Sequence, residues 1–356
     1  MYKLLFDNIV FDLQKSGGIS VVWYELLCRM LRENGANMSF VDNNSSSKGY
    51  RSKIHINGDS IVKRDFFIPV SRYLPIWFHE KASFIFHSSY YRYCKSPYAK
   101  NITTVHDFTY EYFVKGLKKK LHCWQKYNAI RHSDYIVCIS QNTKNDLLKF
   151  LPDIDQNKVR VIHNGVSEDY FVINDNNAGC ELPFKTGTFL VFVGSRAHYK
   201  NFDLLKRVVA RTKYNLVIVG AKLSDDEEND LLKYLSTDRF FSAGFLPNEQ
   251  LNIIYNHAAA LVYPSSYEGF GIPVLEAQRA GCPVIAYNAS SIPEVIGNTP
   301  LLMNELTEEE LLKKIDLLSD EKLMKEVRST GLENSKRFSW DKMYQGYMEL
   351  YREALK

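Results

Sequence analysis

The stretch YEGFGIPVLEAQRAGCPVIAY (Tyr267–Tyr287) combines a glycine-rich turn, a helix and an apolar run. Gly269 and Gly271 remove side chains where the backbone has to turn and approach a ligand. Pro273 suits the first turn of a helix, and Gly281 suits its carboxyl-terminal end. The apolar run after Gly281 is typical of a strand buried on both faces. The stretch therefore predicts a helix followed by a strand of a parallel sheet.

The turn at the start of this helix has the properties of an anion site. Main-chain amides near Gly271 and Ile272 point outward from the helix start, where the helix dipole also favours negative charge. Two acids nevertheless flank the site, Glu268 just before it and Glu276 inside the helix. The pattern is not the dinucleotide-binding fingerprint, because the third glycine is missing. Taken alone, the glycine pair is a weak signal.

Apolar strands and amphipathic helices alternate through the rest of the chain. In the second half, buried parallel strands are predicted at Phe189–Gly194, Asn215–Gly220, Arg239–Gly244, Ala260–Ser265 and Pro283–Asn288. In the first half, strands are predicted at Tyr2–Phe6, Asn37–Asp42, Ser83–Ser89, Asn101–Asp107 and Asp134–Ser140, with helices at Gly18–Asn34 and Gln141–Leu151. The alternation predicts α/β architecture, with one doubly wound parallel sheet in each half of the chain.

A polar, turn-rich region from Val166 to Thr188 separates the two halves and marks the domain boundary. We expect one domain over residues 1–165 and another over residues 166–340. Two such domains facing each other leave a cleft, and ligands of such sheets bind at the carboxyl ends of the strands. The residues directly after each strand are therefore the candidates for function.

Two cations follow the predicted strand Phe189–Gly194. Arg196 offers a planar fork and Lys200 a point charge, so the pair suits a diphosphate. The alternative is a pair of ordinary surface cations, and their place after a strand favours the diphosphate.

The first half has its own candidates at strand ends. Gly17 and Gly18 follow the first strand and lead into a helix, either as a second ligand-approach turn or as a plain tight turn. His106 and Asp107 end another predicted strand. A lone histidine is more often structural than catalytic, but its place at a carboxyl end favours a functional role for His106.

The 356 residues carry a net charge of +4 that is unevenly divided. Residues 1–160 hold 24 Lys and Arg against 14 Asp and Glu, whereas residues 161–356 hold 21 against 27. The basic half suits an anionic lipid, an anionic acceptor or nucleic acid, or it is a solvated surface with a chance imbalance. Of these partners, nucleic acid is the one we do not expect.

Six scattered cysteines, none in a C-x-x-C pair, indicate reduced thiols of a cytoplasmic protein: Cys28, Cys94, Cys123, Cys138, Cys180 and Cys282. Their spacing does not suit zinc. No apolar run reaches the roughly 18 residues of a membrane span, and the N-terminus is predicted as a strand rather than a signal peptide. We therefore expect a cytoplasmic protein, at most peripheral on the inner membrane surface.

The segment Phe113–Ser133 predicts a helix with an apolar and a basic side. Its apolar positions are Leu117, Leu121, Trp124, Tyr127 and Ile130. Such a helix could lie on a membrane. It is equally compatible with an ordinary domain helix that has a lysine-rich outer face, and this second interpretation is preferred.

Residues 189–297 resemble the donor-binding half of the retaining glycosyltransferases of family 4, which have the GT-B fold of two Rossmann-like domains. The motif that carries the resemblance is E-x7-E, here Glu268 and Glu276. It stands in order with GSRAHYKN (194–201), GFLPNEQL (244–251), ALVYPSSYEGFGIPVLEA (260–277) and GCPVIAYNASSIPEV (281–295). In the first half SGGIS, VHD, ISQNTKNDL and VIHNGV also match, so the resemblance covers nearly the whole chain.

The resemblance implies roles for individual residues. Glu276 resembles the acid that accepts from the nucleotide ribose, and Glu268 the acid beside the donor sugar. Arg196 and Lys200 resemble the pair that holds the diphosphate and stabilises it as it leaves. The other implied contacts are Phe270, Gly271 and Ile272 at sugar and phosphate, Phe245 and Leu246 at the base, His106 near the transferred sugar, and Gly17 and Gly18 beside the diphosphate and acceptor.

The resemblance also implies what the two domains do. Residues 1–165, completed by a C-terminal helix over 341–356, would bind the acceptor, and residues 166–340 would bind the nucleotide-sugar donor. The family needs no metal, and no bound cofactor is expected.

The implied reaction is retaining hexosyl transfer to a glycan or lipid-linked acceptor in the synthesis of a cell-surface polysaccharide such as lipopolysaccharide. The segment SRAHYKNF is similar to sequences of mannosyltransferases that use GDP-mannose; UDP-glucose, UDP-galactose or UDP-GlcNAc is the alternative donor. Two carboxylates also suit a glycoside hydrolase, and a phosphorylase has the same fold. A hydrolase, however, has no need of the paired cations and the phosphate-type helix entry.

Overall fold

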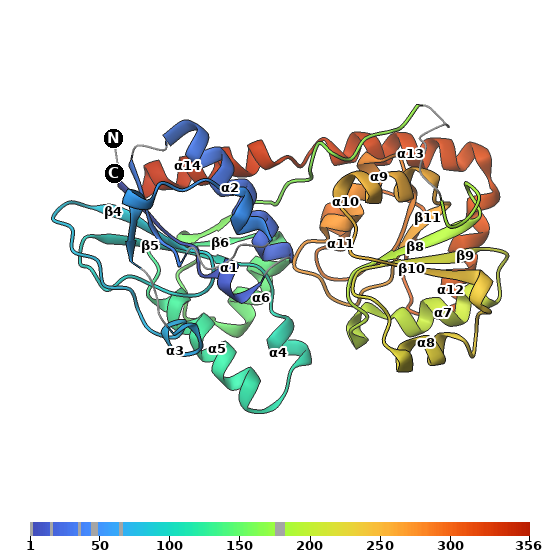
Figure 1. Cartoon of the computed structure of the whole chain (residues 1–356), viewed down its shortest axis with the longest axis horizontal. Helices are drawn as coiled ribbons and strands as arrows, with labels where there is room; N and C mark the ends of the chain where they lie inside the picture. The colour runs from blue at the N-terminus through green and yellow to red at the C-terminus, as the bar shows by residue number, and fades with distance from the viewer. Residues whose placement is uncertain (1–2, 15–16, 35–36, 44–48, 64–66, 175–181) are drawn as a thin grey trace. The chain divides into compact units, whose positions relative to one another are not determined.

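The computed structural model describes residues 3–14, 17–34, 37–43, 49–63, 67–174 and 182–356 (Figure 1). The chain divides into two compact units, one of Met1–Gly165 with Ser339–Lys356 (unit 1) and one of Val166–Phe338 (unit 2). Ser16 of the SGGIS motif, Cys180 and part of the boundary region lie outside the described residues. The other five cysteines are free thiols. Within the described ranges, no helix has both the length and the hydropathy needed to cross a bilayer.

Unit 1 is built on a seven-stranded parallel sheet with strand order β3-β2-β1-β4-β5-β6-β7. The five predicted strands are confirmed, and β3 and β7 are short edge strands that the sequence analysis did not predict. The strands are β1 (Lys3–Asp7), β2 (Met38–Val41), β3 (Ile61–Lys63), β4 (Phe84–Ser88), β5 (Ala99–Val105), β6 (Tyr135–Cys138) and β7 (Val159–Val161).

The helices of unit 1 are α1 (Val10–Leu13), α2 (Gly18–Asn34), α3 (Ile68–Ser71), α4 (Thr109–Phe113), α5 (Gly116–Arg131), α6 (Gln141–Phe150) and α14 (Trp340–Ala354). Serine N-caps begin α6 and α14, because Ser140 accepts from the Thr143 amide and Ser339 from the Lys342 amide. The predicted helix over Phe113–Ser133 is corrected: it begins at Gly116, since Val114 and Lys115 are extended and end α4.

The C-terminal helix α14 packs against α2 and attaches to the sheet through a buried polar network (Figure 1). The Nδ1 of His87 lies 2.6 Å from the Tyr351 hydroxyl, and its Nε2 lies 2.9 Å from Thr104 Oγ1. Thr104 in turn lies 2.8 Å from the Tyr347 hydroxyl. Residues more than 240 positions apart in the sequence thus share one core.

Unit 2 is built on a six-stranded parallel sheet with strand order β10-β9-β8-β11-β12-β13. The five predicted strands are present, and β13 is an additional two-residue edge strand. The prediction of a buried strand is wrong for β10, because it lies at the edge of the sheet and its Phe241 is 45% exposed. The strands are β8 (Phe189–Val193), β9 (Asn215–Val219), β10 (Phe240–Gly244), β11 (Ala260–Tyr263), β12 (Val284–Tyr287) and β13 (Leu302–Met303).

Helices cover both faces of this sheet. α7 and α12 pack together on one face, and α10 and α13 pack together on the other (Figure 1). The α-helices are α7 (Phe202–Ala210), α8 (Asp225–Leu231), α9 (Asn248–His257), α10 (Ile272–Arg279), α11 (Ile292–Ile296), α12 (Glu308–Asp316) and α13 (Glu321–Ser335). The strand order reverses between β8 and β11, so that the loops after these two strands open a site at the carboxyl edge.

Candidate functional site

The glycine-rich turn after β11 lies at this carboxyl edge and starts α10 as predicted. Gly271 is the residue before the helix and has φ of 103°, which favours glycine. A Cβ at this position would lie 2.8 Å from Ile292 Cδ1, so the neighbouring α11 also excludes a side chain. Pro273 stands in the first turn. The backbone can therefore approach a ligand at the start of α10.

Two serines after β12 hold the main chain of this turn. The Glu268 amide donates to Ser290 Oγ at 2.8 Å. The hydroxyl of the fully buried Ser291 lies 2.9 Å from both the Glu268 and the Phe270 carbonyl oxygens. Ser290 itself adopts φ of 52°, a conformation that non-glycine residues rarely adopt. The position of Glu268 is thus fixed by residues that the sequence analysis did not single out.

Lys200 and Glu268 form an ion pair at the centre of the site. The Lys200 Nζ lies 2.5 Å from Glu268 Oε1, and the two side chains are 11% and 12% exposed. The same Nζ is 3.5 Å from the Tyr263 hydroxyl. Burial, with the Glu268 charge beside it, holds the pKa of Tyr263 well above its usual range, so the phenol stays protonated. A cation and a carboxylate are therefore poised together at the entry to α10.

Glu276 lies in α10, one helical turn after its first residue, Ile272. Its Oε2 accepts from the Tyr255 hydroxyl at 3.2 Å. Burial raises the pKa of the Glu276 carboxyl to about 7, although the hydroxyls of Tyr255 and Tyr170 act in the opposite direction. The group is therefore ready to change charge near neutral pH when a hydrogen-bond donor arrives.

Arg196 is held by a different carboxylate. Its Nε and Nη2 donate to the two oxygens of Glu227 at 2.7 and 2.8 Å, and its other donors reach the carbonyls of Ala221 and Lys222 at 2.9 and 3.1 Å. Glu227 also accepts from the amide of Ser224 in a capping box at the start of α8. Hydrogen bonding to Arg196 lowers the pKa of Glu227 to about 2. Arg196 and Lys200 thus have separate carboxylate partners.

The remaining donor-side candidates lie on the same sheet edge. Phe245 follows β10 directly and is 76% exposed, which leaves its ring and main chain open to a planar ligand. Leu246 is half-buried beside it. Phe270 is buried, and Ile272 opens α10.

The unit 1 candidates lie at the carboxyl edge of the other sheet. Gly18 begins α2, and a Cβ at Gly17 would lie 2.6 Å from the Gln14 amide oxygen. His106 follows β5 directly and is buried, and burial lowers the pKa of its imidazole to about 4. His106 is therefore neutral at physiological pH. Next to it, the buried Lys126 ammonium pairs with Glu111 and donates to the Asp107 carbonyl at 3.0 Å.

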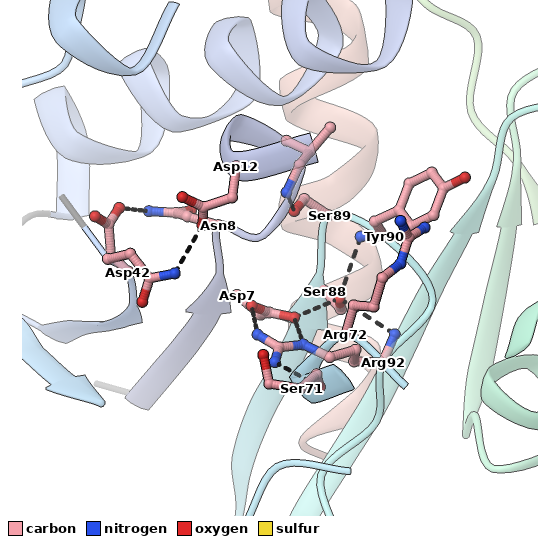
Figure 2. Close-up of polar contacts among 12 residues, drawn as sticks. Asp7, Asn8, Asp12, Asp42, Ser71, Arg72, Ser88, Ser89, Tyr90 and Arg92 are labelled. Atoms are coloured by element: carbon pink, nitrogen blue, oxygen red, sulfur yellow. Dashed lines mark hydrogen bonds and ion pairs between the residues drawn. The ribbon is translucent and has the colours of Figure 1, made fainter. Parts of the chain in front are cut away.

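Polar residues at and after the ends of β1, β2 and β4 make further contacts at this edge (Figure 2). Asp7 forms a buried ion pair with Arg92, and Ser88 donates to Asp7 at 2.7 Å. Asn8 donates to Asp42 at 2.6 Å, and this carboxylate also accepts from Arg51 at 2.8 Å. These charges neutralise one another and fix the loops of the edge. In the part of the chain described, no three side chains from His, Cys, Asp and Glu come together as metal ligands.

Comparison with known proteins finds two matching sequence families. Residues 177–336 match the family described as glycosyl transferases group 1, and residues 16–170 match glycosyltransferase family 4. Among individual relatives, O-antigen chain mannosyltransferase B of Escherichia coli is 26% identical over 262 residues, which is 67% of each chain.

Two further relatives are matched over shorter shares of their length. An uncharacterised glycosyltransferase of Methanocaldococcus jannaschii is 29% identical over 63% of this chain and 61% of its own. The serotype-specific mannosyltransferase WbdA of Escherichia coli is 27% identical over 60% of this chain, which corresponds to 28% of WbdA.

Solved structures match over the whole length. Anabaena HepE in complex with UDP and glucose superposes with a TM-score of 0.71 at 15% identity, covering 98% of this chain and 99% of its own. Sucrose-phosphate synthase of Thermosynechococcus elongatus superposes with a TM-score of 0.72 at 17% identity, covering 99% of both chains. At these identities the likeness establishes the fold, which is GT-B.

Proposed function

Because this chain belongs to the group 1 glycosyltransferases of family 4, a family of retaining enzymes, we propose that it transfers a hexose from a nucleotide-sugar to a glycan or lipid-linked acceptor of a cell-surface polysaccharide. In this proposal unit 2 binds the donor and unit 1 binds the acceptor. The observation that carries the donor site is the juxtaposition of Lys200, Glu268 and the glycine entry to α10 at one sheet edge.

Lys200 is proposed to hold the diphosphate and to stabilise it as it leaves. The bond between the anomeric carbon and the phosphate oxygen breaks, negative charge grows on the diphosphate and positive charge on the sugar ring. The Lys200 ammonium and the outward-facing amides at Gly271 and Ile272 stabilise the negative charge. A preorganised donor of this kind contributes about 3–4 kcal/mol in comparable sites. Glu268 would accept hydrogen bonds from the sugar hydroxyls and stabilise the positive charge on the sugar ring. The ion pair keeps both groups ordered until the donor arrives.

Glu276 is proposed to bind the ribose of the nucleotide. Ribose hydroxyls are neutral donors, and they favour the charged form of a carboxyl whose pKa burial has raised to about 7. A bare anion gains nothing from this group. The two acids beside the anion site would therefore favour a nucleotide-sugar over free phosphate, with Phe245 and Leu246 at the base.

Arg196 is proposed as the second ligand of the diphosphate. Its guanidinium is already bidentate with Glu227, so the diphosphate has to share it or replace that carboxylate. In unit 1, Gly17, Gly18 and neutral His106 are proposed to lie near the transferred sugar and the acceptor. His106 would act there through hydrogen bonds, since its ring carries no charge at neutral pH.

GDP-mannose is the proposed donor, supported by relatives that are named mannosyltransferases. UDP-hexoses are the second candidate, favoured by the UDP complexes of the structural neighbours. A screen of the full chain against GDP-mannose, UDP-glucose, UDP-galactose and UDP-GlcNAc tests both. The proposal predicts thermal stabilisation and slow hydrolysis with GDP-mannose, and it is wrong if none of the four donors binds or is consumed.

The acceptor is proposed to be an anionic or lipid-linked glycan at the inner face of a membrane, because the basic charge lies in the first half of the chain. Radiolabel transfer from the donor identified above into a lipid extract tests this, and label that enters only free sugar contradicts it.

A further inference from the structure

Helix α5 exposes the face that its sequence would place in the core. Leu117, Leu121 and Trp124 stand at helical spacing on one stripe and are 80%, 42% and 53% exposed. The inner face of α5 instead buries the polar Gln125 and Lys126 together with Ala129 and Ile130. The preferred interpretation, an ordinary helix with a lysine-rich outer face, agrees with the exposed lysines and the buried Ile130. The predicted separation into an apolar and a basic side is wrong for Leu117, Leu121 and Trp124, which are exposed as well. Large apolar side chains gathered on a surface mark an interaction site.

The orientation of α5 is fixed from inside the unit. The Lys126 ammonium lies 2.8 Å from Glu111, and both side chains are fully shielded from water. The same ammonium lies 4.2 Å from the centre of the Phe108 ring. Turning the helix to bury Leu117 and Trp124 would expose or break this ion pair, which is costly for a buried pair. The apolar stripe is thus held outward by the fold.

The neighbouring α3 region carries exposed apolar side chains of its own. The Gln125 side-chain amide donates to the Arg72 carbonyl at 2.7 Å, which places the end of α3 against α5. In and around α3, three further apolar side chains are more than half exposed: Phe67, Val70 and Leu74. We name these three residues with Leu117, Leu121 and Trp124 the α3–α5 surface. It presents apolar side chains from two segments of unit 1.

The charge beside this surface is positive. Lys115, Lys118 and Lys120 are exposed, and none of them forms a salt bridge with any residue that the structure describes. α5 itself contains no Asp or Glu. A second copy of this chain docked symmetrically would set lysines against lysines. An anionic lipid surface neutralises them, accepts the apolar side chains and suits a tryptophan at the interface.

We propose that the α3–α5 surface docks unit 1 onto an anionic membrane, with Leu117, Leu121 and Trp124 inserted at the headgroup level and the three lysines at the lipid phosphates. This gives the proposed membrane-proximal acceptor a defined point of attachment. The docking proposal takes from the proposed function only that the acceptor lies at a membrane, because docking itself requires neither donor nor turnover. Failure of vesicle binding and failure of transfer can therefore be told apart.

Flotation of the full-length protein with vesicles tests the proposal without any donor present. We expect binding to phosphatidylcholine vesicles that contain about 30% phosphatidylglycerol, weak binding to phosphatidylcholine alone, and release as salt is raised to about 0.5 M. The double variant L117S/W124S should lower the bound fraction at least about tenfold, since burying one large apolar side chain is worth about a factor of ten. K118E/K120E should abolish the preference for anionic lipid.

The matched control is Leu232→Ser, which removes a 40% exposed leucine from unit 2 and should leave vesicle binding unchanged. Tryptophan fluorescence gives a second readout, because Trp23 and Trp340 are buried whereas Trp77 and Trp124 are exposed. Brominated lipid should quench the wild-type protein, and Trp124→Phe should lose most of that quenching. The proposal is overturned if the folded wild type does not float with anionic vesicles, or if L117S/W124S binds as wild type. It is also overturned if the surface instead yields a dimer that these substitutions dissociate.

Discussion

Glu276 shows how the chemistry of a single residue depends on its surroundings. Its carboxyl lies in α10 beside the hydroxyls of Tyr255 and Tyr170, and burial raises its pKa to about 7. Between the ordinary pKa and this value the folded state binds more protons than the unfolded state. The stability that this group contributes is therefore present at low pH and is lost as the pH rises through 4.5 to 7.

The variant Glu276→Gln tests the predicted pH dependence of stability. The glutamine side chain has the same size and cannot ionise. The difference in melting temperature, variant minus wild type, should therefore be larger at pH 8 than at pH 5.

The same variant should bind the nucleoside diphosphate at least about tenfold more weakly, because a charged acceptor for ribose hydroxyls is lost. Exposed Glu249 provides the control substitution. Equal melting differences at the two pH values would contradict the pKa assignment, and unchanged affinity would contradict the ribose assignment.

Glu227→Gln tests the competition for Arg196. Loss of the negative charge leaves the guanidinium hydrogen-bonded to the Ala221 and Lys222 carbonyls but weakens its main ionic partner. If the diphosphate shares Arg196, its binding should tighten several-fold, measured by calorimetry with GDP and UDP. Weaker or unchanged binding would instead mean that Arg196 serves only to hold the loop before α8.

At the residue scale the sequence predicts which groups stand at the sheet edge, but not their partners. Glu268, Glu276 and Lys200 lie where their places after strands predict. The Arg196 partner could not be predicted, because Glu227 is 31 residues away and is brought near by the packing of α8. The same holds for Ser290 and Ser291, whose contacts to the turn cross from β12 to β11.

At the scale of elements, the function of the turn before α10 depends on the segment after β12. A single serine hydroxyl, that of Ser291, lies within hydrogen-bond distance of two carbonyls of the turn and so connects the two segments. The sequence pattern predicted the turn, α10 and the strand β12, because apolar runs and residues typical of helix ends are local signals. Side-chain contacts between segments have no local signal.

Ser291→Ala should therefore act on catalysis more than on donor binding. The turn loses its fixed position while Lys200 and Glu276 remain, so kcat should fall by about 10- to 100-fold, whereas KM changes less. Steady-state kinetics with the donor identified by the screen measures this. Restoration of kcat in Ser291→Thr, which keeps the hydroxyl, is the matched control, and a change confined to KM would contradict the positioning role.

For α5 the local pattern predicted the helix but not which of its residues are buried and which are exposed. The exposed positions of Leu117 and Trp124 follow from the buried Lys126–Glu111 pair, whose partners lie on different helices. An amphipathic pattern identifies two faces, and only tertiary contacts decide which of them is inward.

At the scale of the whole molecule, the two units differ in how they respond to acid. Burial lowers the pKa of three unit 1 histidines, to about 3 for His87 and His122 and to about 4 for His106. The unfolded state takes up these protons below about pH 6.5, whereas the folded state does not. The stability contributed by these neutral rings is therefore present above pH 6.5 and is lost as the pH falls.

Unit 1 should consequently unfold first on acidification. Each fully buried histidine contributes a loss of about 2 kcal/mol in the free energy of unfolding between pH 6.5 and pH 5. Hydrogen exchange at pH 7 and pH 5, corrected for intrinsic rates, should show protection falling in β4 and β5 before it falls in β8 and β11. His87→Gln should reduce this pH dependence while lowering stability at neutral pH. Simultaneous loss of protection in both sheets would contradict the expectation.

The GT-B fold was predictable at this scale because ten parallel strands have mostly apolar sequences, and they recur in two sets. Three of the edge strands, β3, β7 and β13, have only two or three residues each, too few to produce a periodic signal.

The central claim is that Lys200, paired with Glu268, serves the departure of a nucleoside diphosphate. The most direct measurement is the rate of nucleoside diphosphate release from the accepted donor by wild type, by Lys200→Met and by the control Lys213→Met, which removes an exposed lysine of unit 2. A loss of about 3–4 kcal/mol of transition-state stabilisation predicts that Lys200→Met is slower by about 100- to 1,000-fold, with Lys213→Met unchanged. A folded Lys200→Met protein that releases the diphosphate at the wild-type rate would contradict the claim.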